Sequence, residues 1–164
     1  AAPPARAARE PGLDRGAFAP DRRTEVEGPR SNRLSHDVRA LIDEARAAAA
    51  QSHAPYSNFP VGAALLAKSG KVFRGVNVEN ASLGLSICAE RNAVFAAVAA
   101  GERAFEAIAI STNAAAPTTP CGACRQVLLE FAEDLPIHLA GKGGAIESTT
   151  LLELVPRPFR SFKP

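Results

Sequence analysis

Two short apolar segments joined by a tight turn constrain the fold of this 164-residue chain most strongly. The sequence VGAALLAKSGKVFRGVNV, residues 61–78, has an apolar run on either side of Ser69-Gly70, which is typical of a β-hairpin. Downstream, helical and strand patterns alternate. This order, β-β-α-β-α-β after a first helix, predicts a mixed α/β sheet flanked by helices.

The remaining elements follow from hydrophobic spacing and from helix-ending residues. A first helix is predicted from apolar residues at helical spacing, with Asn32 or Ser35 as its N-cap: Leu34, Val38, Leu41, Ile42 and Ala45. A second helix is expected over residues 88–100, ending before Gly101. We then expect a strand over 107–111, a helix over 121–133, a strand over 137–140 and a short helix over 151–154.

The first 33 residues differ in composition from the rest of the chain. They are rich in Ala, Pro, Arg and Gly and show no hydrophobic period, so residues 1–33 are predicted to be a disordered extension and residues 34–164 the folded domain. Five acidic residues and a single serine, Ser31, argue against a transit peptide in this segment.

The positions of the charges limit the possible partners. The net charge of +2 lies within residues 1–33, which hold seven arginines and five acidic residues, so the rest of the chain holds twelve of each sign. A folded part without basic excess disfavours nucleic-acid binding. The apolar runs reach about seven residues, far short of the roughly 20 that span a bilayer, which predicts no membrane partner. Three cysteines suit a reducing, cytoplasmic location.

The stretch PTTPCGACRQVLLEF places Cys121 and Cys124 three positions apart at a predicted helix start. This spacing fits a redox pair, half of a zinc site or two small core residues, and alone it does not decide between them. Cys88, in LSICAERNAVFAAVAAG, also stands at a predicted helix start. Three sulfurs at two helix N-termini favour a tetrahedral zinc site whose fourth position is open to water.

Glu90 stands two residues after Cys88, in the first turn of the same predicted helix. A carboxylate there would favour the helix dipole whether or not it had another role. Beside a zinc-bound water it could instead take a proton and deliver it to a leaving group. Of the histidines, His138 is expected to be a hydrogen-bonded sheet residue and His53 a loop residue, which leaves the open zinc site as the better interpretation.

The segments CAERNA and PCGACRQVL together resemble the zinc-dependent nucleoside deaminases, and within them the small homotetrameric, three-cysteine cytidine deaminases. The segments PYSNFPVGAALL and GVNVENAS match the same family, so the resemblance covers about residues 36–160. It implies an α/β/α three-layer fold, one zinc ion per subunit and a homotetramer. The implied reaction is hydrolytic deamination of cytidine and 2′-deoxycytidine in pyrimidine salvage.

The resemblance also implies roles for individual residues. It implies that zinc is bound by Cys88, Cys121 and Cys124, and that Glu90 moves the proton. Its implied substrate contacts are Phe59 at the base or sugar, Asn77 and Glu79 at the ribose hydroxyl, Ala89 at the base edge, and Phe159 at a base in a neighbouring subunit. Arg91 is expected to withdraw charge from the thiolates.

Two residues depart from the family pattern. Leu83 stands where an aromatic residue is common, which affects a subunit or sugar contact, and Asn92 replaces a common threonine. The nearest alternative function is a deaminase of another cytosine nucleoside such as blasticidin S. A thiol–disulfide oxidoreductase and a non-catalytic zinc-stabilised binding module are the alternatives from other classes. The oxidoreductase gives no role to Cys88 and Glu90, and the binding module gives none to Glu90.

Overall fold

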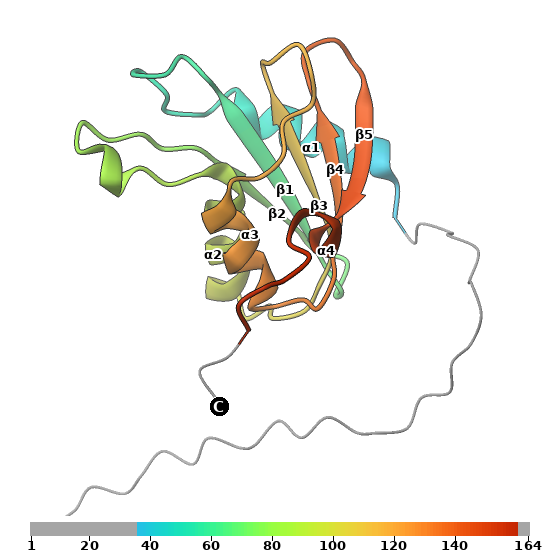
Figure 1. The fold of residues 1–164 in the computed structure, drawn as a ribbon. Coiled ribbons are helices and arrows are strands. Elements are labelled where there is room, and N and C mark those ends of the chain that lie inside the picture. The colour runs from blue at the N-terminus through green and yellow to red at the C-terminus, as the bar shows by residue number, and fades with distance from the viewer. Residues whose placement is uncertain (1–35, 161–164) are drawn as a thin grey trace, which may run out of the picture. The chain divides into compact units, whose positions relative to one another are not determined.

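The computed structural model describes residues 36–160 of the chain (Figure 1). The predicted extension over residues 1–33 and the two predicted N-caps, Asn32 and Ser35, lie outside these residues. Within them, the N-cap of the first helix is Asp37, whose side chain accepts hydrogen bonds from the backbone N–H groups of Arg39 and Ala40. The expected N-cap positions were therefore too early by at least two residues.

The described residues form one five-stranded mixed sheet with the strand order β2-β1-β3-β4-β5. Strands β3 and β4 are parallel, and the other neighbouring pairs are antiparallel. The strands are β1 (Val61–Ala67), β2 (Val72–Val76), β3 (Phe105–Thr112), β4 (Pro136–Ala140) and β5 (Ile146–Thr150). The first two strands are the predicted hairpin.

Helices cover both faces of the sheet, which gives three layers (Figure 1). The helix α1 (Val38–Ala49) packs on one face, and α2 (Ala89–Ala99) and α3 (Gly122–Leu129) lie on the other. The short helix α4 (Leu151–Leu154) joins the second layer through the buried Leu151. The predicted α/β/α architecture is confirmed. No helix among residues 36–160 is long and apolar enough to cross a membrane.

The core is divided by the alternation of side chains along the central strands. In β1, Ala64 and Leu66 face α1, whereas Ala63 and Leu65 face α2 and α3. Because both faces are covered, β1 and β3 read as almost continuous apolar runs.

A glycine in each hairpin strand lets a helix approach the sheet closely. A Cβ at Gly62 would lie 2.0 Å from the carbonyl oxygen of Ala45 in α1. A Cβ at Gly75 would lie 2.2 Å from the carbonyl oxygen of Ala89 in α2. Gly75 therefore fixes how near the first turn of α2, which carries Glu90, comes to the sheet.

Three elements differ from the sequence prediction. Strand β5 was not predicted because its residues are mostly polar and, at the edge of the sheet, all of them are exposed or half-buried, so the strand shows no apolar alternation. The 3₁₀ turn η1 (Leu83–Leu85) was also missed. Helix α3 ends at Leu129, four residues before the predicted end, because the chain turns there and Phe131 packs against Phe105, with ring centroids 5.4 Å apart.

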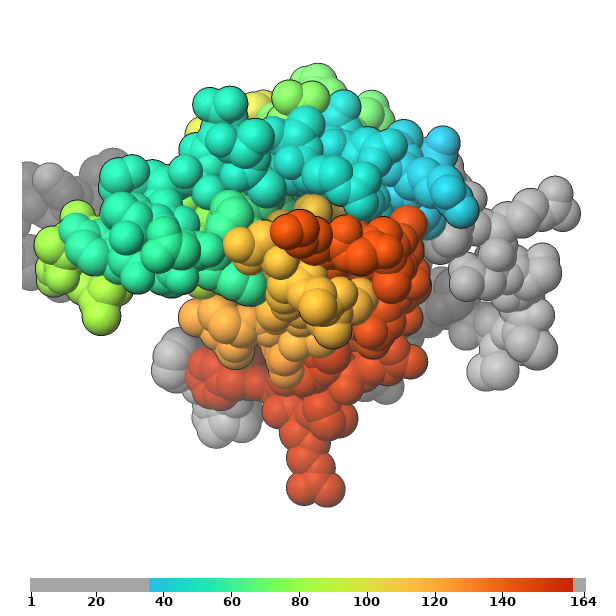
Figure 2. All heavy atoms as spheres, turned by 90° about the horizontal axis from the view of Figure 1, so that it is seen from above, coloured from blue at the N-terminus to red at the C-terminus, as the bar shows by residue number. Residues whose placement is uncertain are grey.

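Several loops meet at one end of the sheet, as the view from above shows (Figure 2). The segments 51–60 and 77–88 run side by side, joined by hydrogen bonds between His53 and its neighbours Asn77 and Glu79. The loop after β3 is tied to the first of these segments, since Asn113 Nδ2 donates to the Asn58 carbonyl oxygen across 3.1 Å. These loops form the rim of the candidate site.

Candidate active site

The three cysteines meet where the N-termini of two helices face each other. Cys88 is the N-cap residue of α2, and Cys121 is the N-cap residue of α3. Cys124 lies in the first turn of α3 and is fully buried. The three sulfur atoms all lie within 4.8 Å of one another, although Cys88 is separated from the other two by more than thirty positions.

The spacing of the sulfurs suits a zinc ion. The Sγ of Cys121 lies 3.9 Å from that of Cys88 and 3.5 Å from that of Cys124. Sulfurs at the corners of a tetrahedron with Zn–S bonds of about 2.3 Å would be about 3.8 Å apart. Together with the soft thiolate donors, this geometry fits one zinc ion held by three cysteines, with a fourth position left for another ligand.

Hydrogen bonds among the sulfurs shift the pKa values of Cys88 and Cys124 in opposite directions. The pKa of Cys88 falls to about 5, chiefly because Cys124 hydrogen-bonds to its sulfur and then because Arg91 does. The pKa of Cys124 is raised by the same hydrogen bond and by burial. Cys88 is thus a thiolate near neutral pH, and thiolates are the form that binds zinc.

Arg91 contacts this cluster directly from the first turn of α2. Its Nη2 lies 3.5 Å from the Sγ of Cys88 and 3.3 Å from the carbonyl oxygen of Ser86. The pKa of Arg91 is raised, first by the hydrogen bond to Cys88. A cation is therefore held against a metal-binding sulfur, at a helix N-terminus where the dipole alone would disfavour it.

Glu90 is a buried carboxyl beside the sulfurs. Its residue is 5% exposed, and burial raises its pKa, with the Cys88 thiolate raising it further. A carboxyl with a raised pKa next to a metal site suits the transfer of protons near neutral pH.

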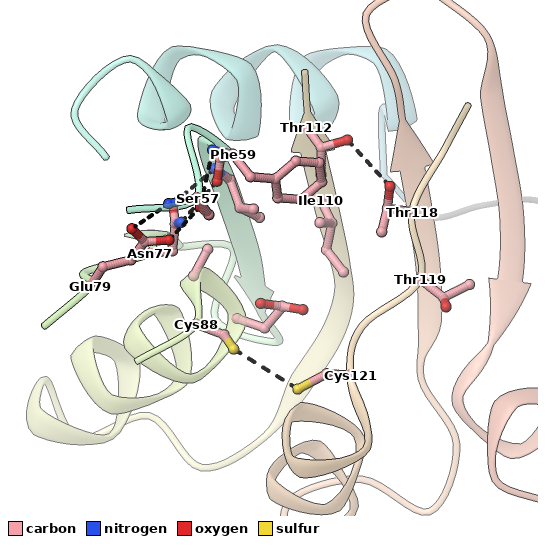
Figure 3. Close-up of a pocket in the computed structure, with 13 residues that line it drawn as sticks. Ser57, Phe59, Asn77, Glu79, Cys88, Ile110, Thr112, Thr118, Thr119 and Cys121 are labelled. Atoms are coloured by element: carbon pink, nitrogen blue, oxygen red, sulfur yellow. Dashed lines mark hydrogen bonds between the residues drawn. The ribbon is translucent and has the colours of Figure 1, made fainter. Parts of the chain in front are cut away.

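Glu90 lines a cavity of about 420 Å³ whose walls come from the start of α2, the N-cap of α3, β1, β3 and the loops at the end of the sheet. Figure 3 shows Cys88 and Cys121 on one side of this cavity and Ser57, Asn77 and Glu79 together on another. Seven predicted site residues line the cavity: Phe59, Asn77, Glu79, Cys88, Ala89, Glu90 and Cys121. Four segments distant in sequence therefore contribute to one space.

Asn77 holds the backbone on both sides of Pro60. Its Nδ2 donates to the Phe59 carbonyl oxygen across 2.9 Å, and its Oδ1 accepts from the Val61 N–H, also at 2.9 Å. These bonds fix Phe59 at the cavity wall and use one of the two hydrogens on the Asn77 amide. The other hydrogen remains as a donor toward a ligand.

Glu79 is held in its ionised form by the segment opposite. Its Oε2 accepts from the N–H groups of Tyr56 and Ser57 at 2.9 and 3.2 Å, and its Oε1 accepts a short hydrogen bond from the Ser57 hydroxyl. The hydrogen bond from the Ser57 side chain is the largest cause of the lowered pKa of Glu79. A carboxylate with four lone-pair positions can accept one further hydrogen bond there.

Three predicted site residues do not line this cavity: Cys124, Arg91 and Phe159. Cys124 is buried beside the other two sulfurs, and Arg91 contacts Cys88. Phe159 is 56% exposed, and its carbonyl oxygen accepts a hydrogen bond from Gln126 Nε2. Its predicted contact with a base would therefore have to be made in another subunit.

The chain is similar in sequence to proteins of one known family. Residues 35–138 match the model of the cytidine and deoxycytidylate deaminase zinc-binding region. Cytidine deaminases of Sporosarcina psychrophila and Halalkalibacterium halodurans are 47% and 48% identical over 124 residues, which is 75% of this chain and 91% and 94% of theirs. The chain belongs to the cytidine and deoxycytidylate deaminase family.

A solved structure of a member of this deaminase family supports the same assignment. The cytidine deaminase from Burkholderia pseudomallei is 50% identical and has a TM-score of 0.72, covering 74% of this chain and 98% of its own. The three-cysteine site is thus the zinc-binding region of a deaminase of this family.

Within this deaminase, the two departures from the family pattern have different settings. Asn92 joins α2 to the sheet, because its Nδ2 donates to the Val76 carbonyl oxygen across 2.7 Å. Leu83 lies in η1 and is 71% exposed, so most of its surface is not packed within residues 36–160.

Sequence reasoning missed six residues that line the cavity: Ser57, Val61, Ile110, Thr112, Thr118 and Thr119. A usable signal existed for Ser57, which lies in the segment PYSNFPVGAALL that carries the resemblance. The sequence holds no such signal for Ile110 and Thr112, because it is the register of the strands that brings the end of β3 to the same cavity as Phe59.

Proposed function

We propose that this chain catalyses the hydrolytic deamination of cytidine and 2′-deoxycytidine to uridine and 2′-deoxyuridine, with release of ammonia. The observation that carries the proposal is the position of Glu90, a buried carboxyl with a raised pKa that lines a cavity beside three convergent cysteines. Residues 34–164 would form the deaminase domain.

The zinc ion would be held by Cys88, Cys121 and Cys124, and when bound it lowers the pKa of a water and so supplies the nucleophile at neutral pH. Glu90 would accept the proton from that water and pass it to the cytosine ring and the departing amine. One water is consumed, the C4–N bond breaks, and a carbonyl oxygen replaces the amino group. Proton transfer of this kind contributes about 10²–10⁴-fold to rate.

The base would be oriented by α2 and by Phe59. Ala89 is the first residue of α2, so its N–H has no acceptor within the helix and can donate to the carbonyl oxygen of a pyrimidine. Phe59 would cover the base or sugar from the opposite wall. A pocket that hydrogen-bonds the polar edge of cytosine rejects analogues without that edge.

The sugar would be bound by Asn77 and Glu79. The free hydrogen on Asn77 and the remaining lone pairs of Glu79 suit a ribose hydroxyl, which can both accept and donate. Because Glu79 is ionised, a phosphate at the same place would be repelled. The substrate class that fits is a nucleoside with a free 3′-hydroxyl.

We further propose that the enzyme is a homotetramer of the cytoplasm that acts in pyrimidine salvage. Phe159 is exposed and lies outside the cavity of its own chain, which suits a contact with a base in a neighbouring subunit. A cytoplasmic location is supported by the three cysteines, none of which forms a disulfide in the described residues. Light scattering that finds a fully active monomer would remove the tetramer from the proposal.

The other candidate functions have less support. A blasticidin S-type deaminase is not favoured, since the close relatives are named cytidine deaminases. A thiol–disulfide oxidoreductase would need Cys121 and Cys124 to alternate between the dithiol and the disulfide, and this function gives no role to Glu90. A non-catalytic zinc module would tolerate the loss of Glu90.

The experiment that tests the proposal is ammonia release from cytidine by the zinc-loaded protein, beside a Glu90→Gln variant. We expect release from the wild type and a loss of about 10²–10⁴-fold in the variant. Glu102→Gln is the matched control, because Glu102 is a carboxylate bonded to Ser69 and Lys71 away from the cavity. If the folded, zinc-replete wild type released no ammonia from cytidine, the proposed substrate would be refuted. If the wild type and Glu90→Gln released ammonia at equal rates, the role of Glu90 would be refuted.

A further inference from the structure

Arg125 follows Cys124 in α3, and its guanidinium reaches three acceptors in two other parts of the chain. Its Nε donates to the Pro120 carbonyl oxygen at 2.7 Å, and its Nη2 donates to the Thr119 hydroxyl at 3.1 Å. Its Nη1 donates to the Leu154 carbonyl oxygen at 2.9 Å. One side chain thus joins the loop before α3 to the end of α4.

The two acceptors in the loop belong to the active site. The carbonyl of Pro120 is part of the peptide group that leads directly into Cys121, and Pro120 is fully buried. Thr119 lines the cavity. The hydrogen bonds from Arg125 therefore fix the orientation of the peptide that carries a metal-binding sulfur, and of a side chain at the cavity wall.

The acceptor in α4 belongs to the C-terminal segment. Gln126, the next residue of α3, donates from Nε2 to the Phe159 carbonyl oxygen at 2.9 Å. Two adjacent residues of α3 therefore bind positions 154 and 159, at the two ends of one segment. The segment that carries Phe159 and the loop that carries Cys121 share Arg125 as a common support.

We infer that Arg125 is a positioning residue that holds Cys121 in place for zinc and couples its position to the C-terminal segment. The consequence for catalysis rests on the proposed deaminase function, whereas the consequence for zinc retention does not.

Arginine is required by the arrangement of the acceptors. A planar guanidinium offers five N–H donors in fixed directions, so it can bond the loop and α4 at once. The ammonium of a lysine is a single point on a flexible stem and cannot reproduce three separated bonds. Loss of the Arg125 guanidinium would leave the carbonyl of the buried Pro120 without this donor, which favours a rearrangement of the loop.

The test measures how fast zinc passes from the holoenzyme to a chromophoric chelator, at a temperature where each variant is folded. Residues that orient metal ligands change metal affinity by about 10- to 100-fold when they are lost. We expect Arg125→Met to release zinc faster by a factor in this range. Arg103→Met is the matched control, because Arg103 also bonds two backbone carbonyls, of Val98 and Glu102, but does not contact the cavity.

Arg125→Lys keeps the charge and provides a second variant if Arg125→Met does not fold. It is also expected to release zinc faster than the wild type, because it lacks the planar guanidinium that makes the three hydrogen bonds. Release at the wild-type rate by either folded variant would overturn the inference, as would equal acceleration in Arg103→Met. Because no substrate is used, fast release in a protein without deaminase activity would support the positioning role and refute only the proposed function.

Discussion

Arg91 places a guanidinium nitrogen 3.5 Å from the sulfur of Cys88. Three thiolates around one Zn²⁺ leave a net charge of −1, which makes a water at the fourth position less acidic than in a site of neutral ligands. The positive charge of Arg91 and the N-terminal ends of α2 and α3 oppose this excess. The contact therefore links a residue outside the cavity to the chemistry inside it.

Replacing Arg91 with glutamine should slow deamination without emptying the metal site. We expect Arg91→Gln to lower kcat by about 10- to 100-fold and to move the acidic limb of the pH–rate profile to higher pH, because the water becomes harder to ionise. The measurement is kcat against pH with zinc content determined in parallel. Arg46→Gln is the control, since Arg46 pairs with Asp43 on the surface. An unchanged profile at full zinc content would contradict the prediction.

The metal site was the part of the molecule that sequence could predict best. Thiols and a neighbouring carboxyl have few common roles, so Cys88, Glu90 and the CGAC motif limit the chemistry even before their positions are known. The hydrogen bonds around Glu79, where we propose that the sugar binds, could not be predicted this way. Glu79 is bound by Ser57, 22 positions away, and that contact depends on how two loops run side by side.

Glu79 provides a prediction about substrate binding. Glu79→Gln should raise KM for cytidine by about 10- to 100-fold with a smaller effect on kcat, because a hydrogen bond to a charged group is lost. The ratio of variant to wild-type KM should fall toward one for 3′-deoxycytidine, which lacks the hydroxyl that Glu79 is proposed to bind.

The control for this prediction is Glu102→Gln, which removes a bonded carboxylate away from the cavity. It should leave KM unchanged for both nucleosides. If Glu79→Gln raised KM equally for cytidine and 3′-deoxycytidine, Glu79 would act only by holding the segment around Ser57.

His138 is buried in β4 between two partners, as a hydrogen-bonded sheet residue. Its Nε2 lies 2.9 Å from Nε2 of His36, and its Nδ1 lies 2.8 Å from the Ser148 hydroxyl. Burial lowers the pKa of His138, and His36 lowers it further. His36 in turn faces Glu106, whose Oε1 lies 3.6 Å from Nδ1 of His36.

This arrangement predicts a loss of stability in mild acid. Below about pH 6.5 the unfolded chain binds a proton at His138 that the folded chain does not. The free energy of unfolding therefore decreases as the pH is lowered, by up to about 1.4 kcal/mol per pH unit. The contribution is lost as the pH drops toward the lowered folded pKa. Urea unfolding of the wild type and of His138→Gln between pH 5 and 8 measures the difference in slope.

Acid also weakens metal binding to the cysteines, but both proteins carry the same three ligands. The comparison of slopes therefore isolates the histidine, whatever the absolute stability of the variant. Parallel curves for the wild type and His138→Gln would show that His138 does not titrate differently on folding.

The central layers of the fold could be predicted because apolar spacing reports burial on both faces of the sheet. The hairpin, the helix after Cys88 and the strand around Ile108 all lie in the core. Strand β5 could not be predicted, since an edge strand with exposed side chains lacks that pattern. The close packing at Gly75 is likewise invisible in sequence, because it depends on which helix crosses that strand.

Gly75 in β2 sets the distance between the sheet and the helix that carries Cys88 and Glu90. In Gly75→Ala the new Cβ would lie 2.2 Å from the Ala89 carbonyl oxygen and 2.4 Å from the Ala93 nitrogen, so α2 must move outward. We expect a loss of about 1–3 kcal/mol or more in unfolding free energy, as is typical of overpacking, together with faster zinc release. Gly143→Ala is the control, because its nearest neighbour is 3.6 Å away. Thermal unfolding and chelator assays give both quantities, and a variant as stable as the control would show that α2 can shift without cost.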